Sequence, residues 1–291
     1  METNIDTMRR LLLAYLPSAR GGMETGVDGV SLFRVDASFK KRPQLYQPQI
    51  ILLAQGKKRI YLGDNQFEYD SCHYYVQAVP LPVECEAVIE EGKPMLGMVL
   101  KIDPQMIGEI LYEMNPELPV TGKVSNSLYD AVLSDEIVDA AVRLLKTLHS
   151  QNEKRVLGPL YLKELIFKVL CGEKGEILRE LAINNRGFYQ ISRIINKIHE
   201  NYSDPFDVQM LAREAGMSST AFHSTFRAMT STSPLQYIKN VRLHKAKELI
   251  QQGGEKASAA ALLVGYESSS QFSREYKRCF GVTPGADRLV V

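Results

Sequence analysis

Two stretches in the last third of the chain share one pattern: Val208-Gln-Met-Leu-Ala212-Arg-Glu-Ala-Gly216-Met-Ser218 and Ala257-Ser-Ala-Ala-Ala261-Leu-Leu-Val-Gly265-Tyr-Glu-Ser268. Each contains Ala-x-x-x-Gly, then a serine within three residues, then a helical stretch. The alanine lets two helices cross closely, the glycine adopts the left-handed conformation that ends the first helix, and the serine caps the next helix. Gln271 is expected to complete a capping box with Ser268. The pattern predicts two helix-turn-helix units, at about 208–229 and 257–280.

The second helix of each unit carries apolar residues on one face only. The buried faces are expected to be Phe222, Phe226 and Met229 in the first unit and Phe272, Tyr276 and Phe280 in the second. The free faces carry Ser219, Thr220, His223, Ser224 and Arg227 in the first unit and Ser269, Ser270, Gln271, Arg274 and Lys277 in the second. Short polar side chains and arginines suit base edges and phosphates in a major groove. One such unit occurs in many proteins that do not bind DNA, but two in tandem, each with a basic helix, favour a reader of double-stranded DNA.

A long helix is expected between the two units. Ser233 and Pro234 provide a cap and a first position, and the apolar spacing continues to Gly253-Gly254. About 17 helical residues span ~25 Å. That length could hold the DNA-reading faces of the two units near one turn of B-DNA apart, ~34 Å. We call the two units, at about 208–229 and 257–280, the two reading heads.

Charge is unevenly distributed along the chain. Residues 183–291 hold 14 Lys and Arg against 9 Asp and Glu, a net charge of +5, whereas residues 1–182 hold 21 against 25, a net charge of −4. A basic half joined to an acidic half is typical of a nucleic-acid-binding domain fused to a second domain. We therefore expect a sensing or dimerisation domain at 1–182 and a DNA-binding domain at 183–291.

The first half is rich in short β-type runs separated by Gly and Pro. Strands are expected at 30–35, 49–54, 59–62, 74–79, 84–89 and 95–102, with a hairpin turn at Gly63-Asp64-Asn65. Amphipathic helices are expected at 105–114, 134–148 and 159–170, and again from residue 190 onward. The fold class is therefore α+β: a small antiparallel barrel with trailing helices, followed by an all-helical domain.

The second half resembles the C-terminal domain of AraC/XylS-type regulators. The resemblance rests on Thr232-Ser-Pro-Leu-Gln-Tyr-Ile-Lys-Asn-Val-Arg-Leu, on Gly265-Tyr-Glu-Ser-Ser-Ser-Gln-Phe-Ser-Arg-Glu-Tyr-Lys-Arg and on Phe280-Gly-Val-Thr-Pro284. Tyr276 stands where that family usually has Phe. The resemblance implies base reading by Thr220, His223, Ser224, Ser269, Ser270 and Arg274, with Arg227, Gln271 and Lys277 expected on the DNA backbone.

The run Val79-Pro-Leu-Pro-Val-Glu-Cys85-Glu resembles the subgroup of this family that has a distinctive AraC-type N-terminal domain. That subgroup includes a bacterial activator of aldehyde-reductase genes that responds to glyoxal. The resemblance implies a cupin-like barrel, a small-molecule effector, a homodimer and activation through contact with RNA polymerase.

Four residues of the first half are candidates for sensing: Cys72, Cys85, Tyr46 and Tyr74. The two cysteines flank one β-type run and would face one cavity if their strands paired. A thiolate could capture an electrophile such as an aldehyde, provided that a nearby positive group lowers the pKa of the thiol. The alternative is that the cysteines and tyrosines are ordinary core residues.

Other classes of protein are disfavoured. Residues 1–182 contain only His73 and His149, too few for a cupin metal site, and no GxSxG, P-loop or GxGxxG motif is present, so we expect no metal, cofactor or catalytic residue. No apolar run reaches the ~20 residues of a membrane span, and four cysteines without CxxC spacing suggest reduced thiols in the cytoplasm. The rival interpretations are a β-barrel enzyme with a helical scaffold and a first domain that only dimerises.

Overall fold

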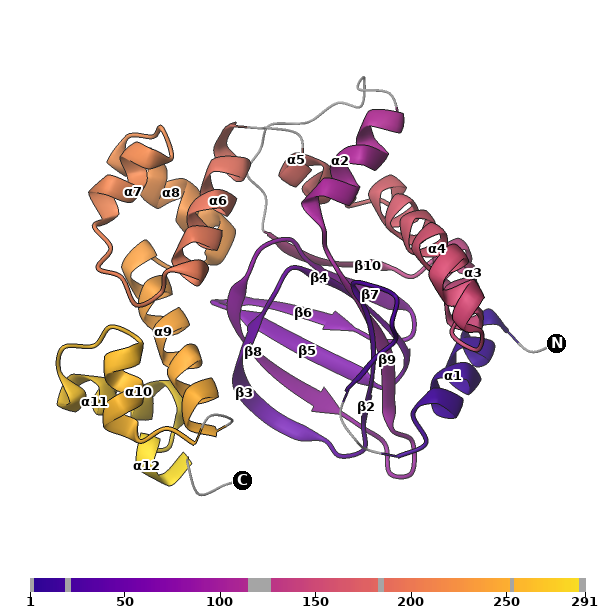
Figure 1. The fold of residues 1–291 in the computed structure, drawn as a ribbon, viewed down its shortest axis with the longest axis horizontal. Coiled ribbons are helices and arrows are strands. Elements are labelled where there is room, and N and C mark those ends of the chain that lie inside the picture. The colour runs from indigo at the N-terminus through magenta and orange to yellow at the C-terminus, as the bar shows by residue number, and fades with distance from the viewer. Residues whose placement is uncertain (1–2, 19–21, 115–126, 183–185, 252–253, 288–291) are drawn as a thin grey trace.

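The computed structural model describes residues 3–18, 22–114, 127–182, 186–251 and 254–287 (Figure 1). Its first half contains two antiparallel sheets. The larger sheet has the order β1 (Gly22–Glu24), β2 (Val30–Val35), β9 (Met95–Lys101), β4 (Gln49–Gln55), β7 (His73–Gln77) and β10 (Leu128–Val132). The smaller sheet has the order β3 (Phe39–Tyr46), β8 (Leu81–Val88), β5 (Lys57–Leu62) and β6 (Asn65–Tyr69). We call these two sheets and their covering helices the β domain.

The burial pattern of each strand shows what covers it. In β8 the side chains of Leu81, Val83, Cys85 and Ala87 are buried and alternate with more exposed ones, because one face of the smaller sheet faces the hydrophobic core and the other is covered only in part, by contacts with α9 (Pro234–Gln251) and α11 (Ser269–Phe280). Strand β4 is buried from Ile50 to Ala54 without alternation. Helix α1 (Asn4–Tyr15) packs on β4 and β9, so the larger sheet is covered on both faces.

Four further helices complete the β domain: α2 (Pro104–Glu113), α3 (Asp135–Thr147), α4 (Gln151–Cys171) and α5 (Glu176–Ala182). Helices α3 and α4 pack against each other as a hairpin beside the sheets (Figure 1). The expectation that the second of these helices starts at residue 159 was wrong. It starts at Gln151 and includes Pro159, and the hydroxyl of Ser150 caps it by accepting from the backbone N–H of Glu153.

The second half is helical throughout the residues described. It comprises α6 (Arg186–Glu200), α7 (Val208–Glu214), α8 (Ser219–Thr230), α9 (Pro234–Gln251), α10 (Ala257–Leu263), α11 (Ser269–Phe280) and α12 (Pro284–Asp287). The expected long connecting helix is α9, which has 18 residues. Among the residues described, no helix is both long and apolar enough to cross a lipid bilayer.

Two hydrophobic cores divide the molecule at an unexpected place. Phe222 and Phe226 of α8 and Tyr237 of α9 belong to one core that continues into the β domain. The second core is smaller and contains Phe272 and Tyr276 of α11 with parts of α9 and α10. The packing therefore joins the first helix-turn-helix unit to the β domain and leaves the second unit as a separate core. The expected domain boundary after residue 182 adjoins residues 183–185, which lie outside those described, and stays a prediction.

Candidate nucleic-acid interface

The first helix-turn-helix unit has the geometry that its sequence predicts. Ala212 is buried where α7 and α8 meet, and Gly216 has φ +65°, in the left-handed region. The hydroxyl of Ser218 accepts from the backbone N–H of Ala221 and so caps α8. Phe222, Phe226 and Met229 are fully buried on the inner face of that helix.

The second unit repeats this arrangement with one difference. Ala261 is buried, Gly265 has φ +80°, and Ser268 accepts from the backbone N–H of Gln271. The expected reciprocal capping box is wrong, because the side-chain amide of Gln271 donates to Glu275 Oε1 at 3.2 Å instead. The hydroxyl of Tyr276 donates to Asp287 Oδ2 at 2.7 Å in the buried core. This contact gives a reason for tyrosine at that position.

The predicted DNA-reading side chains lie on the outward faces of α8 and α11. All of the predicted positions are exposed: Thr220, His223, Ser224 and Arg227 on α8, and Ser269, Ser270, Gln271, Arg274 and Lys277 on α11. Both helices are anchored from behind, α8 by ring contacts among Phe222, Phe226 and Tyr237 and α11 by Phe272 and Tyr276. Each unit therefore presents one polar helix face from a rigid apolar support, the arrangement of a major-groove reader.

Arg242 of α9 connects the two units. Its guanidinium donates to the backbone carbonyls of Tyr202 (2.8 Å) and Asp204 (2.8 Å), which precede α7, and to that of Gly265 (3.1 Å) in the turn of the second unit. A planar guanidinium with several fixed donors can satisfy such a set of carbonyls. The two reading heads are thus held by this contact as well as by the length of α9.

The first unit also packs on the β domain. The hydroxyl of Tyr237 donates to the Pro80 carbonyl (2.5 Å) and therefore accepts from His199 Nε2 (2.7 Å), and the hydroxyl of Ser127 donates to the Met229 carbonyl (2.5 Å). Burial lowers the pKa of His199 to about 4, so this histidine is neutral at neutral pH. Sequence reasoning missed the contacts of Pro80 and Ser127, because they join these residues to α9 and α8 across more than one hundred positions.

Two tandem helix-turn-helix units with exposed polar and basic helix faces define a DNA-binding transcription regulator. The comparisons with known proteins give its family. Residues 26–177, more than half of the chain, match the family described as "AraC-type transcriptional regulator N-terminus", and residues 211–289 match a helix-turn-helix domain family. The chain belongs to the AraC-type transcriptional regulators. The narrower resemblance to a glyoxal-responsive subgroup stays a prediction.

Curated relatives are regulators too. The chain is 26% identical to the virulence regulon transcriptional activator VirF of Yersinia enterocolitica, over 67% of this chain and 70% of that protein. It is 25% identical to the transcriptional regulator ExsA of Pseudomonas aeruginosa, over 67% and 68%. These relatives do not support the alternative of a β-barrel enzyme.

A solved structure has the same overall fold. Fatty-acid-bound ToxT of Vibrio cholerae aligns with a TM-score of 0.60 at 10% identity, covering 94% of this chain and 96% of that one. This similarity confirms the expected order of a β domain followed by a helical domain.

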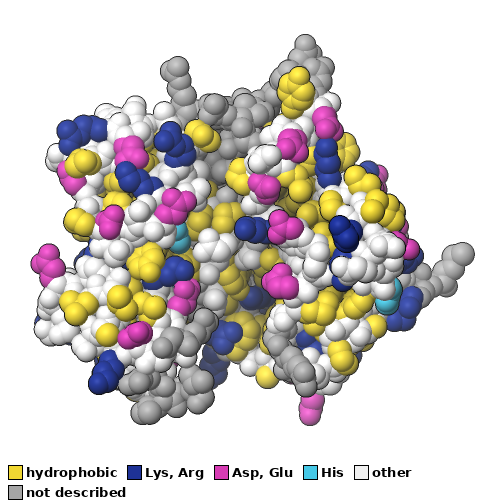
Figure 2. All heavy atoms as spheres, viewed as in Figure 1, with side chains coloured by type: hydrophobic (Ala, Val, Ile, Leu, Met, Phe, Trp, Pro, Cys, Tyr) yellow, Lys and Arg dark blue, Asp and Glu magenta, His cyan; other side chains and the backbone are white. Residues whose placement is uncertain are grey.

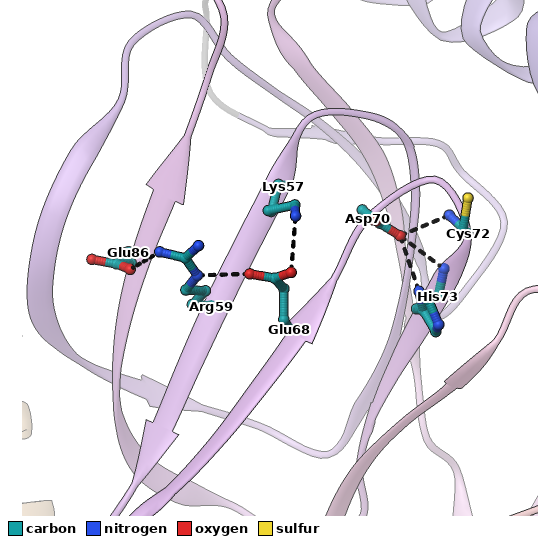
Figure 3. Close-up of polar contacts among 7 residues, drawn as sticks. All are labelled: Lys57, Arg59, Glu68, Asp70, Cys72, His73 and Glu86. Atoms are coloured by element: carbon teal, nitrogen blue, oxygen red, sulfur yellow. Dashed lines mark hydrogen bonds and ion pairs between the residues drawn. The ribbon is translucent and has the colours of Figure 1, made fainter.

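The structure places the four candidate sensing residues at three different sites. Tyr46 and Cys85 lie together between the sheets, where the tyrosine hydroxyl donates to the thiol sulfur at 3.7 Å. Cys72 lies in the turn before β7, where its backbone N–H donates to Asp70 (Figure 3). The expectation that Cys72 and Cys85 share a cavity was wrong, because β7 pairs with β4 and β10 whereas β8 pairs with β3 and β5.

Tyr74 faces a different part of the molecule. It lines a cavity of about 490 Å³ between β10, α3 and α4, together with Phe167 and Cys171. Within the part of the chain that the structure describes, its buried hydroxyl has no hydrogen-bond partner, and burial raises its pKa to about 12. Tyr74 and Tyr46 therefore do not line one pocket.

Proposed function

We propose that the protein activates transcription by placing α8 and α11 in adjacent major grooves of one DNA duplex. The observation that carries this proposal is the pair of exposed polar helix faces on two linked units. The named activator among the relatives supports the direction of regulation. We further propose contact with RNA polymerase as the activating step and, as a regulator must share a compartment with the DNA it binds, a cytoplasmic location.

We also propose that the β domain binds a small-molecule effector and transmits its state to the reading heads. Two observations support this. The first unit shares its hydrophobic core with the β domain, so a conformational change in the sheets would be transmitted to α8. The ToxT structure with similar fold is described as bound to an unsaturated fatty acid.

The test is DNA binding by fluorescence anisotropy across a salt series, with duplexes selected by the protein from random sequence. Phosphate contacts predict a steep loss of affinity with salt.

Arg274→Ala should cost about 1–3 kcal/mol, roughly 5- to 150-fold in affinity, and relax the preference at one base position. Lys277→Ala is the matched control on the same helix. If Lys277 contacts a phosphate, this substitution should weaken binding to all duplexes equally and reduce the slope of log affinity against log salt concentration by about 1. An unchanged sequence preference in Arg274→Ala would contradict base reading.

A homodimer through α4 is the assembly that the surface favours. This helix is apolar on two sides, and its outer side exposes Val156, Leu160 and Phe167 at helical spacing, with exposed fractions of 65%, 58% and 37%. Figure 2 shows hydrophobic side chains gathered over this part of the molecule. An exposed apolar stripe of this kind marks a protein interface, and identical copies can pair through it by twofold symmetry.

The dimer is tested by light scattering on the purified protein. We expect the mass of two chains for the wild type and of one chain for Leu160→Glu, because a carboxylate in the apolar stripe would be buried without a partner. Glu substitution at exposed Met210, outside the stripe, should leave the mass unchanged. A wild-type mass of one chain at micromolar concentration would overturn the α4 proposal and leave the DNA-binding proposal intact.

A further inference from the structure

A short chain of polar groups lies between the two sheets. The amine of Lys58 on β5 donates to the hydroxyl of Tyr46 on β3, and that hydroxyl donates to the thiol of Cys85 on β8. Tyr69 and Tyr75 stack beside this chain with ring centroids 5.0 Å apart, and the buried hydroxyl of Tyr69 has no hydrogen-bond partner among the residues described. A buried polar group without its full set of hydrogen bonds destabilises a core, so such groups call for an explanation.

Lys58 differs sharply from the lysine beside it. Successive side chains of a strand point to opposite faces, so Lys57 and Arg59 point outward, where they pair with Glu68 and Glu86 (Figure 3). Lys58 points inward. Among the residues described, no carboxylate lies within ion-pair distance of its amine, and its hydrogen bond goes to a neutral phenol.

The surroundings of Lys58 disfavour its positive charge. Burial lowers the pKa of Lys58, and the guanidinium of nearby Arg42 acts in the same direction, while Cys85 opposes them. By contrast, the hydrogen bond to Glu68 raises the pKa of Lys57. The rings of Tyr46 and Phe39 lie 4.9 and 5.9 Å from the Lys58 amine, and all three residues are partly rather than fully buried.

We propose that Lys58 is a covalent binding site for a small aldehyde, which it captures as an imine. This inference rests on the proposed function, since it identifies the ligand class of the β domain. The amine nitrogen attacks the carbonyl carbon to give a carbinolamine, and loss of one water then forms the C=N bond, so no oxidant or reductant is needed. An amine that is desolvated and close to another cation is the kind of lysine that forms such bonds. Tyr46 is positioned to hold the amine and to exchange a proton with the departing oxygen.

The geometry favours the amine over either candidate thiol. Cys85 is 1% exposed and lies behind Tyr46, so an incoming aldehyde meets the amine and the phenol first. Cys72 is exposed, but it lies in a turn away from the space between the sheets (Figure 3). Capture at Lys58 also removes a hydrogen-bond donor from Tyr46, which gives the ligand a way to alter the contact between β3, β5 and β8.

The first experiment measures labelling. The full-length protein is treated with limiting propanal and sodium cyanoborohydride, which traps the imine as a propyl amine, and peptide mass spectrometry compares Lys58 with Lys57. We expect faster labelling at Lys58, by about tenfold for each unit that separates the two pKa values, because only the neutral amine reacts. As pH rises, the Lys58 rate should level off before that of Lys57. In urea-unfolded protein the two lysines should react equally.

The second experiment connects capture to DNA binding. Lys58→Arg keeps a positive charge but cannot form an imine, and Lys57→Arg is the matched control with the same reagent. We expect propanal to change the DNA affinity of the wild type and of Lys57→Arg but not of Lys58→Arg. Equal labelling of Lys57 and Lys58 in the folded protein would overturn the proposal. So would a propanal effect that persists in Lys58→Arg and is lost in Cys85→Ser. Selective labelling of Lys58 in a protein that does not bind DNA would instead refute only the proposed function.

Discussion

Gly265→Ala is expected to unfold the second helix-turn-helix unit. The glycine has φ +80°, and a β-carbon there would overlap with the backbone carbonyl oxygen of Ser203. Left-handed backbone alone costs an L-residue about 1–2 kcal/mol. The clash is with backbone, which cannot rotate away, so we expect a total loss above about 4 kcal/mol, the range of severe core defects.

Gly216→Ala is the matched control, because Gly216 occupies the same position in the first unit. It also has a positive φ, +65°, but the nearest atom to its would-be β-carbon is the side-chain amide nitrogen of Gln190, at 3.5 Å. Only the backbone strain applies there, so the loss should be about 1–2 kcal/mol. Urea unfolding monitored by circular dichroism compares the two variants. Equal losses would show that the contact between Gly265 and Ser203 does not exist in solution.

Sequence reasoning predicted the helix-turn-helix units well because their determinants are local. A glycine that needs positive φ and a serine that caps the following helix act within three residues of each other, as at Gly216 and Ser218. The same reasoning could not distinguish Gly216 from Gly265. The difference lies in a loop that precedes Gly265 by some sixty positions and packs against it only after folding.

The β domain was harder to predict for a physical reason. Strand β3 was missed because Lys40, Lys41 and Arg42 give it little hydrophobic alternation and Pro43 interrupts it. It lies at the edge of the smaller sheet, where charged residues and proline are tolerated. Strand β10 was also missed, since it pairs with β7 across some fifty residues. Without β3 there was no reason to place Tyr46 beside Lys58, so the inward lysine was overlooked.

Arg242→Ala should uncouple the two reading heads. It removes three hydrogen bonds from one charged group to three backbone carbonyls, and we expect a stability loss of about 3 kcal/mol, since each charge-assisted bond contributes about 1.5–3 kcal/mol before water replaces part of it. Lys245→Ala on the same helix is the control. Its ion pair with Glu248 is local and solvent-accessible, so its loss should be below about 1 kcal/mol.

The larger effect of Arg242→Ala is expected on DNA. Two heads held at a fixed spacing bind the second half-site as an intramolecular event, which increases affinity by about 10²–10⁴-fold over one head. When the Tyr202–Asp204 loop and the Gly265 turn are no longer joined by Arg242, that gain should fall by on the order of tenfold or more, because the second head must be ordered on binding. The measurement is the affinity ratio between a selected duplex and the same duplex with one half-site scrambled. A ratio in Arg242→Ala equal to that of the wild type would mean that α9 alone sets the spacing, and the contact at Gly265 would then serve stability only.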